Sequence, residues 1–374
     1  MPGEQEKRDW LRLIRTQSIG PITFQRLIEK FGSAGEAILA LPEFSKQSGR
    51  KKPLTLAPID LIEKEIEAAD RAGAQLIAQF EPDYPVPLRD IPDAPPVIYV
   101  RGNPSLFDKP AIAIIGARNA SGIGRKIARA LSTDLGDAGF SIVSGLARGI
   151  DGAAHEAALR NGTIAVVAGG VDHIYPPEHE ALMDEIGRSG VVLSEQPIGY
   201  PPTARDFPKR NRLISGLSRG VIVVEAAKKS GTLITARFAL EQGREVFAVP
   251  GSPLDPRCEG ANRLIADGAT LTQNANDVVD QLRQSLRSIS ERDTDSDWRA
   301  ATAALNSEFE ESALRATLRE QVLSLLSYTP IHRDEILRET NLPAGPVADA
   351  LLDLVLSEDA IEHPGGAFSL HSAD

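Results

Sequence analysis

Residues 111–124 read AIAIIGARNASGIG, and this stretch decides the fold. Its five apolar residues, Ala111–Ile115, are followed by a glycine-containing loop and then by a helical stretch. An apolar run that ends in glycine is typical of a parallel strand buried on both faces. Where such a strand leads through a loop into a helix, free N–H groups and the helix dipole favour a phosphate. The alternative is a glycine turn that serves packing alone.

Further apolar runs of the same kind follow, separated by helical stretches. They are Phe140–Val143, Thr163–Ala168, Val191–Ser194, Val221–Glu225 and Glu245–Val249. This alternation predicts βαβ units and an α/β fold, an extended Rossmann-like, doubly wound, mostly parallel sheet over residues 75–283. Ligands of such sheets bind beyond the carboxyl ends of the strands, where this sequence concentrates its glycines.

The loop after the first run differs from a dinucleotide-binding loop. The second glycine of the GxGxxG pattern leaves room for a pyrophosphate, and here Arg118 stands in its place. The second run ends in Ser144-Gly145 and lacks the acidic residue that binds a ribose. Arg118 adds a positive fork that suits a single phosphate. We therefore expect phosphate contacts from Gly116, Arg118, Ser121 and Gly122.

The second loop reads SGLARGIDGAAH over residues 144–155. Asp151 and His155 are four residues apart at a helix start and could form an acid–base pair. We favour the alternative that Asp151 caps the helix and His155 packs under the loop, because neither a nucleophile nor a carboxylate partner lies nearby. Arg148 is a candidate DNA contact. The sequence predicts no catalytic residue and no cofactor.

A basic motif with one aromatic residue reads FPKRNRLIS over residues 207–215. An aromatic side chain beside cations and an amide can stack a base while pairing with its phosphates. The alternative is a solvated basic loop. The motif follows the fourth predicted strand and so lies at the same sheet edge as Arg118, and this position favours DNA binding. The candidate contacts are Phe207, Lys209, Arg210, Asn211 and Arg212.

A second anion site is predicted at Ser230, Gly231 and Thr232, which open a helix after the fifth strand. The segment resembles the Gly-Thr-x-x-Glu motif of the LOG-type nucleotide phosphoribohydrolases, which use that Glu in catalysis. Thr235 stands in its place here, which argues for binding without hydrolysis.

The flanking segments predict two smaller domains. Residues 1–74 predict helices, and the turn Ser18-Ile19-Gly20-Pro21 between two of them resembles a helix-hairpin-helix, with Gly20 at positive φ. The alternative is an ordinary helical turn. Residues 284–312 predict a linker.

Residues 313–374 predict a winged helix, with three helices followed by a hairpin at Gly365-Gly366. The helices are expected at Leu314–Ser327, Arg333–Thr340 and Ala344–Glu358.

The charge of the chain is unevenly distributed. The 374 residues carry a net charge of −11, but residues 284–374 hold 7 Lys and Arg against 17 Asp and Glu. The remaining 283 residues hold 34 against 35, so they are nearly neutral and can bind phosphate at local basic spots. The winged-helix segment 316–374 has 3 cations against 10 acids and is expected to contact protein instead of duplex DNA.

Composition limits the remaining classes of protein. The single cysteine, Cys258, excludes an intramolecular disulfide framework and a cysteine-based zinc cluster. No stretch is apolar for the roughly 18 residues that a membrane span requires. A polar start without a signal peptide predicts a cytoplasmic protein.

Taken in order, the motifs resemble the DprA/Smf family (DNA processing protein A), in its long form with an N-terminal helical domain and a C-terminal winged helix. The shared stretches run through residues 80–283: Gly116-x-Arg118, Ser144–His155, Ile174–Pro176, Ser194-Glu195, Phe207–Ile214, Val224–Ala226, Ser230–Thr232, Thr235-Ala236, Val249–Gly251 and Gly260–Ile265.

The resemblance implies a protein that binds single-stranded DNA, forms a homodimer and loads the recombinase RecA during natural transformation. It carries DNA contacts over to Arg118, Phe207–Arg212 and Ser230–Thr232, and it marks no residue for RecA or for the dimer. The alternative function is a LOG-type nucleotide phosphoribohydrolase on the same kind of sheet.

Overall fold

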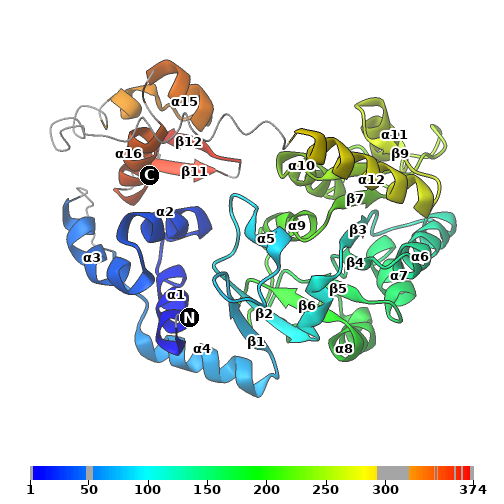
Figure 1. The fold of residues 1–374 in the computed structure, drawn as a ribbon, viewed down its shortest axis with the longest axis horizontal. Helices are drawn as coiled ribbons and strands as arrows, with labels where there is room; N and C mark the ends of the chain where they lie inside the picture. Colours follow the sequence, from blue (N-terminus) through cyan, green and yellow to red (C-terminus); the bar gives the residue numbers. More distant parts are fainter. Residues whose placement is uncertain are drawn as a thin grey trace. The chain divides into compact units, whose positions relative to one another are not determined.

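The structure is a computed structural model of the chain. It describes residues 3–47, 54–292, 319, 321–340, 342, 344–357, 359–363 and 365–370. The chain divides into two compact units, Asp60–Arg292 and a second unit that combines Met1–Ile59 with Asp293–Asp374 (Figure 1).

The unit Asp60–Arg292 is built on one large sheet. Among the described residues the strand order is β1-β2-β6-β5-β4-β3-β7-β8-β9 (Figure 1). The β1–β2 and β2–β6 pairs are antiparallel, and the remaining pairs are parallel. The strands are β1 Gln75–Ala78, β2 Val97–Gly102, β3 Ala111–Ile115, β4 Ser141–Ser144, β5 Thr163–Val166, β6 Val191–Ser194, β7 Gly220–Val223, β8 Glu245–Ala248 and β9 Thr270–Leu271.

The predicted α/β fold with a mostly parallel sheet is confirmed. The six expected strands correspond to β3–β8, with bounds that differ by at most two residues. The sequence pattern does not reveal β1, β2 or β9. These strands lie toward the two edges of the sheet, and β9 pairs with β8 over only Thr270 and Leu271. A pairing so short leaves no periodicity to detect.

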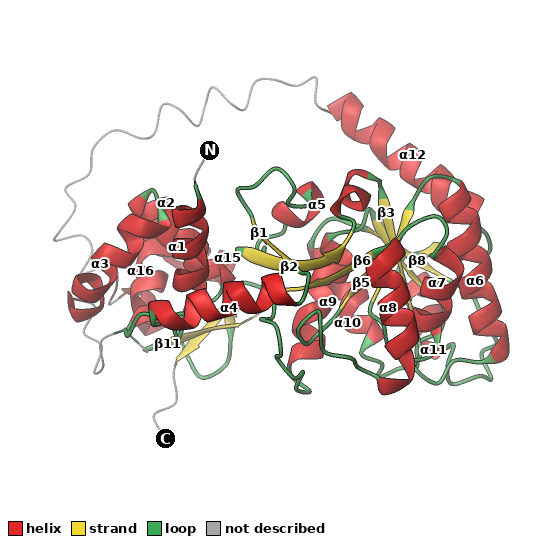
Figure 2. Cartoon of the chain, turned by 90° about the horizontal axis from the view of Figure 1, so that it is seen from below, coloured by secondary structure: helices red, strands yellow, loops and turns green. Residues whose placement is uncertain are grey.

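Helices cover both faces of the sheet (Figure 2). On one face α6, α7 and α12 pack around a core that includes Leu131, Ala154 and Val278. On the other face α5, α9 and α10 bury Leu88, Leu213 and Ala236. The helices of this unit are α4 Ile59–Arg71, α5 Val86–Arg89, α6 Gly122–Asp137, α7 Ile150–Ala158, α8 Glu180–Ser189, α9 Asp206–Gly216, α10 Thr232–Glu241, α11 Glu259–Ala266 and α12 Ala275–Arg292, with 3₁₀ turns η1 Pro104–Asp108 and η2 Pro177–His179.

The order of the strands creates a switch point beside β3. The chain passes from β3 to β4, β5 and β6 on one side and then returns to β7 on the other side of β3. At such a point, the loops that follow neighbouring strands diverge and leave a crevice outside the sheet. The loops after β3, β4 and β7 are the glycine-containing segments that the sequence singles out.

The second unit begins with helices α1 Glu4–Ile14, α2 Pro21–Phe31 and α3 Ala34–Gln47. The rings of Trp10 and Phe24 join α1 to α2, with centroids 4.8 Å apart in an edge-to-face arrangement. The prediction that Gly20 supplies the positive φ of the turn is wrong. Ser18 has φ of 66°, and Gly20 is the N-cap of α2 with φ of −98°. The residue before a proline is driven toward extended backbone, which explains this conformation of Gly20.

The predicted winged helix is present in the second unit. Strands β10 Ile331–His332, β11 Ala360–His363 and β12 Ala367–Leu370 form an antiparallel sheet in the order β10-β12-β11, beside helices α15 Arg333–Thr340 and α16 Ala344–Leu356. Gly365 and Gly366 turn the hairpin with φ of 87° and 73°, as expected. Of the expected helix Leu314–Ser327, residues 314–318 and 320 lie outside the described residues, and residues 319 and 321–325 are helical.

The expected domain boundaries differ from the compact units at two places. Helix α4 belongs to the sheet unit, where the Tyr99 hydroxyl of β2 donates a hydrogen bond to Glu65. Helix α12 continues to Arg292, so the first residues of the expected linker are helical, and residues 293–312 lie outside the described ones. No helix in the described part of the chain is long and apolar enough to cross a membrane.

Candidate nucleic-acid interface

An open cavity lies at the switch point, beyond the carboxyl ends of β3, β4 and β7. It consists of two adjoining hollows of about 860 and 420 Å³ that share Arg118, Tyr175, Phe207 and Arg210. Their volumes are typical of ligand sites. We call this space the switch-point cavity. Its walls are the loop after β3 (Gly116–Asn119), the loop after β4 (Gly145–Arg148), the first turns of α9, and the start of α10 (Ser230–Thr235).

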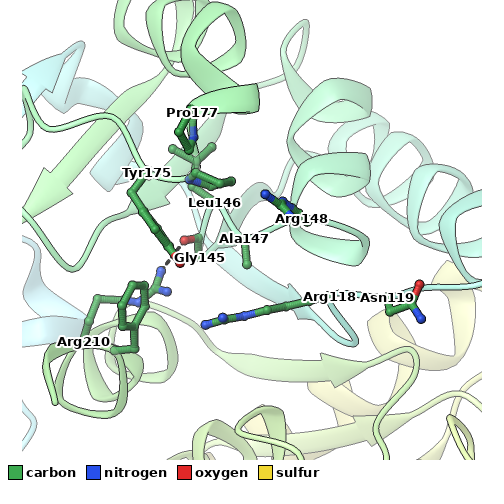
Figure 3. Close-up of a pocket in the computed structure, with 11 residues that line it drawn as sticks. Arg118, Asn119, Gly145, Leu146, Ala147, Arg148, Tyr175, Pro177 and Arg210 are labelled. Atoms are coloured by element: carbon green, nitrogen blue, oxygen red, sulfur yellow. Dashed lines mark hydrogen bonds between the residues drawn. The ribbon is translucent and has the colours of Figure 1, made fainter. Parts of the chain in front are cut away.

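One side of the switch-point cavity is an aromatic and cationic surface. The Arg118 guanidinium lies 5.4 Å from the centroid of the Phe207 ring, and the Tyr175 ring lies 5.3 Å from the same ring. Figure 3 shows the Arg118 side chain extending across the cavity, whereas Asn119 turns away from it. Arg118 and Tyr175 are both exposed, so this surface can present a charge and a stacking face to a ligand.

The opposite side is the start of α10, which hydrogen bonds hold against the β3 loop. The Thr232 hydroxyl donates to the Gly116 carbonyl over 3.1 Å, and the Ser230 hydroxyl donates to Thr232 Oγ1 over 3.0 Å. The Asn211 amide donates to the Gly231 carbonyl over 3.4 Å. These bonds fix three cavity walls relative to one another. Gly231 is exposed and is the N-cap of α10, and the Thr232 amide donates a hydrogen bond to the Ser230 hydroxyl over 3.2 Å.

Arg210 lines the cavity, but one of its guanidinium nitrogens is bound by backbone carbonyls of the protein. Its Nη1 donates to the carbonyls of Gly145 and Val166. Burial lowers the pKa of Arg210 to about 10, and the nearby Asp151 carboxylate acts in the opposite direction. A Cβ on Gly145 would lie only 2.5 Å from Arg210 Nη1 and 2.7 Å from Asp151 Oδ2, so a larger residue would displace these side chains. Arg210 therefore helps to hold the β4 loop in place.

Asp151 and His155 have structural surroundings, as the favoured interpretation expects. Asp151 Oδ2 accepts a hydrogen bond from the Ala147 amide over 3.1 Å, although Gly149 and not Asp151 is the N-cap of α7. Burial raises the pKa of Asp151, against the charge of Arg210. His155 is fully buried, its Nδ1 lies 2.6 Å from the Thr163 hydroxyl, and burial lowers its pKa to about 3.

Two of the expected phosphate contacts do not line the cavity. Ser121 and Gly122 begin α6, and neither is part of the cavity wall. The Ser121 amide and hydroxyl both donate to the carboxylate of Glu225, over 2.9 and 2.5 Å. The start of α6 thus already binds an anion of the protein itself, the Glu225 carboxylate.

Three further cations of the predicted site have different surroundings. Arg148 lines the rim of the cavity, and its guanidinium pairs with Glu178. Lys209 is exposed on α9 but is not part of the cavity wall. Arg212 is buried away from the cavity, where it pairs with Asp93 at 3.1 Å and with Glu195.

The structure adds cavity residues that the sequence reasoning leaves out. Among them are Tyr175, Lys229 and Arg257. Tyr175 belongs to the Ile174-Tyr175-Pro176 stretch of the resemblance, so its aromatic ring is the signal that could have found it. In the described part of the chain, no cluster of His, Cys, Asp and Glu could hold a metal ion.

Family profiles match the chain along most of its length. The profile described as "DNA recombination-mediator protein A" matches residues 75–283, more than half of the chain. The chain belongs to this DprA/Smf family. The profiles of the DprA-like N-terminal HHH domain and of the DprA winged helix domain match residues 4–68 and 307–366. The long form with three domains is therefore shown.

Individual DprA/Smf proteins agree with this assignment. The chain is 37% identical over 300 residues to Protein Smf of Synechocystis sp., covering 74% of this chain and 73% of the relative. The X-ray structure of DNA processing protein A from Streptococcus pneumoniae matches with a TM-score of 0.62 and 35% identity, over 75% of this chain and 98% of that chain. DNA processing protein A of Helicobacter pylori matches with a TM-score of 0.52 and 31% identity, over 57% and 96%. The structure of the Helicobacter protein is described as giving insight into a unique single-stranded DNA binding mode.

Proposed function

We propose that the chain binds single-stranded DNA in the switch-point cavity and acts, without catalysis, as a recombination mediator. The observation that carries the proposal is the convergence of Arg118, Phe207 and Tyr175 with the start of α10 at one sheet edge. Base-stacking rings beside a cation and the N-terminus of a helix are what a flexible single strand requires. A duplex keeps its bases stacked inside and could use only the cations.

A strand has a direct physical path through the cavity. One phosphate would lie on the Arg118 guanidinium, and another at the N-terminus of α10, beside Ser230 and Gly231. A base between or beside these phosphates would stack on Phe207 or Tyr175. The single-stranded DNA binding described for the Helicobacter relative supports this use of the shared fold.

A LOG-type hydrolase would need a carboxylate that is free to act on the sugar. Among the residues that line the cavity, the acidic one is Asp151, which is buried and interacts with Arg210. Glu225 is held by Ser121 outside the cavity wall, and the buried Thr235 stands where those enzymes have their Glu. Release of base from nucleoside monophosphates, abolished by Glu225→Ala, would contradict a non-catalytic role.

The proposal is tested by titrating a short labelled oligonucleotide at several salt concentrations. Arg118→Ala should lower the slope of log K against log salt by about 0.7, because one phosphate contact is lost. Phe207→Ala should cost on the order of 1–3 kcal/mol at nearly unchanged slope, because stacking is uncharged. Arg129→Ala is the matched control, since Arg129 is an exposed cation on α6 that pairs with Glu156 outside the cavity.

Single strands should bind better than a duplex of the same sequence. Equal affinities would contradict the claim of specificity. Unchanged binding by Arg118→Ala and Phe207→Ala, with both variants folded, would show that the strand binds elsewhere.

We further propose that the chain works as a homodimer that protects incoming DNA and loads RecA during natural transformation. Family membership supports this role, and no residue is assigned to either interface. RecA should be retained by the tagged chain in a pull-down, and single-stranded DNA should increase the amount retained. Absence of RecA both with and without DNA would contradict the loading role while leaving the DNA site intact.

A further inference from the structure

The start of α6 is occupied by a side chain from a distant part of the sequence. Ser121 caps this 16-residue helix by accepting a hydrogen bond from the Gly124 amide over 2.8 Å. The Ser121 amide and hydroxyl in turn donate to Glu225 over 2.9 and 2.5 Å. Glu225 follows β7, the strand beside β3, so it reaches α6 across the switch point. The N-terminal end of α6, which follows the loop after β3, therefore binds a carboxylate.

The packing around Glu225 is tight. Its side chain is only 5% exposed. A Cβ on Gly124 would lie 2.5 Å from the Glu225 carboxyl carbon and 2.6 Å from one of its oxygens. Gly124 therefore makes room for the carboxylate, in the glycine loop where a nucleotide-binding sheet makes room for phosphate.

We propose that Glu225 is a specificity-determining residue: a resident anion that closes the α6 start to phosphate. A phosphate at this helix end would need the amide and hydroxyl of Ser121, which already donate to Glu225. It would also lie in contact with the negative charge of the Glu225 carboxylate. Phosphate is thereby left to Arg118 and to the start of α10, which both line the switch-point cavity. Exclusion of phosphate stands by itself, whereas its consequence for a DNA strand rests on the proposed function.

Arg118 and the occupied start of α6 together account for a glycine loop without a dinucleotide site. Arg118 fills the position where a pyrophosphate would approach, and Glu225 fills the helix end that would hold it. A cofactor with a diphosphate is excluded at both points. A single strand needs neither point, because it can spread its phosphates along the cavity.

The test is a titration of the full chain with inorganic phosphate, observed through the backbone amide signals of Ser121, Gly122 and Gly124. The chain itself should show no saturable shift at these amides. Glu225→Ala should show one, because the donors become free and the like charge is gone. Glu225→Gln keeps the shape without the charge and should show a weaker, saturable shift. Glu259→Gln is the matched control, since Glu259 is an exposed acid on α11 that pairs with Lys228.

Each outcome decides the proposal. Saturable shifts at these amides in the unaltered chain would overturn it, as would their absence in folded Glu225→Ala. If the Ala variant does not fold, Glu225→Gln decides in the same way. In oligonucleotide binding, a folded variant with an open α6 start should show a salt slope steeper by about 0.7, for one added phosphate contact. If the Glu225 variants bind phosphate at these amides but neither they nor the unaltered chain bind the oligonucleotide, the proposed function is refuted. The role of Glu225 in excluding phosphate is then still supported.

Discussion

Arg210 and Arg212 lie two residues apart on α9, and both are buried, but their partners differ. Arg210 faces the switch-point cavity and supports the β4 loop. Arg212 lies between Asp93 and Glu195, and its side chain is only 8% exposed. Burial lowers the pKa of Arg212, but the two carboxylates act more strongly and raise it overall. Arg212 therefore stabilises the packing of α9 against the sheet and is not available to bind a phosphate.

This assignment predicts that Arg212→Leu lowers the free energy of unfolding. The loss should be on the order of 3 kcal/mol, because removing one partner of a buried ion pair leaves the carboxylates uncompensated. Lys209→Leu, an exposed neighbour, should change stability by less than about 0.5 kcal/mol. Urea unfolding of both variants measures the difference. If Arg212→Leu is as stable as the unaltered chain and lowers the slope of log K against log salt for DNA binding, the phosphate contact predicted from the sequence would be supported instead.

At the scale of elements, the cavity depends on how α7 is held against the sheet. His155 in α7 contacts the Thr163 hydroxyl of β5, and Thr163 donates to the Ile142 carbonyl of β4 over 3.0 Å. The loop before α7 carries Gly145 and Arg148 of the cavity. The neutral imidazole is thus part of what fixes this wall.

Stability should fall as the pH drops below the ordinary histidine range. An unfolded histidine has a pKa of about 6.5, whereas burial holds that of His155 at about 3. Between these values the unfolded chain binds a proton that the folded chain does not, so the contribution of His155 is complete above about 6.5 and is lost progressively below it. The slope can reach about 1.4 kcal/mol per pH unit.

Urea unfolding across this pH window tests the prediction by comparison of slopes. His155→Asn should be less stable near neutral pH and should show a shallower pH dependence than the unaltered chain. Identical slopes for the chain and for His155→Asn would mean that other groups dominate the acid response.

At the scale of the whole molecule, charge separates the sheet unit from the acidic C-terminal part. The recognition helix position of the winged helix, α16, contains no Lys or Arg and carries Asp349 and Asp353. Within its own unit the winged helix already has a protein contact, since Arg26 of α2 lies 3.7 Å from Glu362 and over the Phe368 ring. Duplex-binding winged helices use cations at such positions to reach phosphates.

Removal of residues 293–374 should therefore leave single-strand affinity essentially unchanged. The complete chain should bind duplex DNA no better than the shortened one, even at low salt, because the acidic surface repels phosphates. Parallel titrations of both forms with a duplex and with a single strand measure this. Tighter duplex binding by the complete chain would show that the winged helix uses contacts that net charge does not predict.

The sequence alone determined the strands β3–β8, the glycine loops, the family and the elements that carry the site. These features depend on neighbouring residues, since apolar runs and glycine act locally on the backbone. Tertiary structure decided which polar groups remain available. Ser121 meets Glu225 across 104 residues of sequence, and Arg212 meets Asp93 and Glu195. Such pairings arise when distant segments pack and bury their charges together. They cannot be predicted from the local pattern of residues.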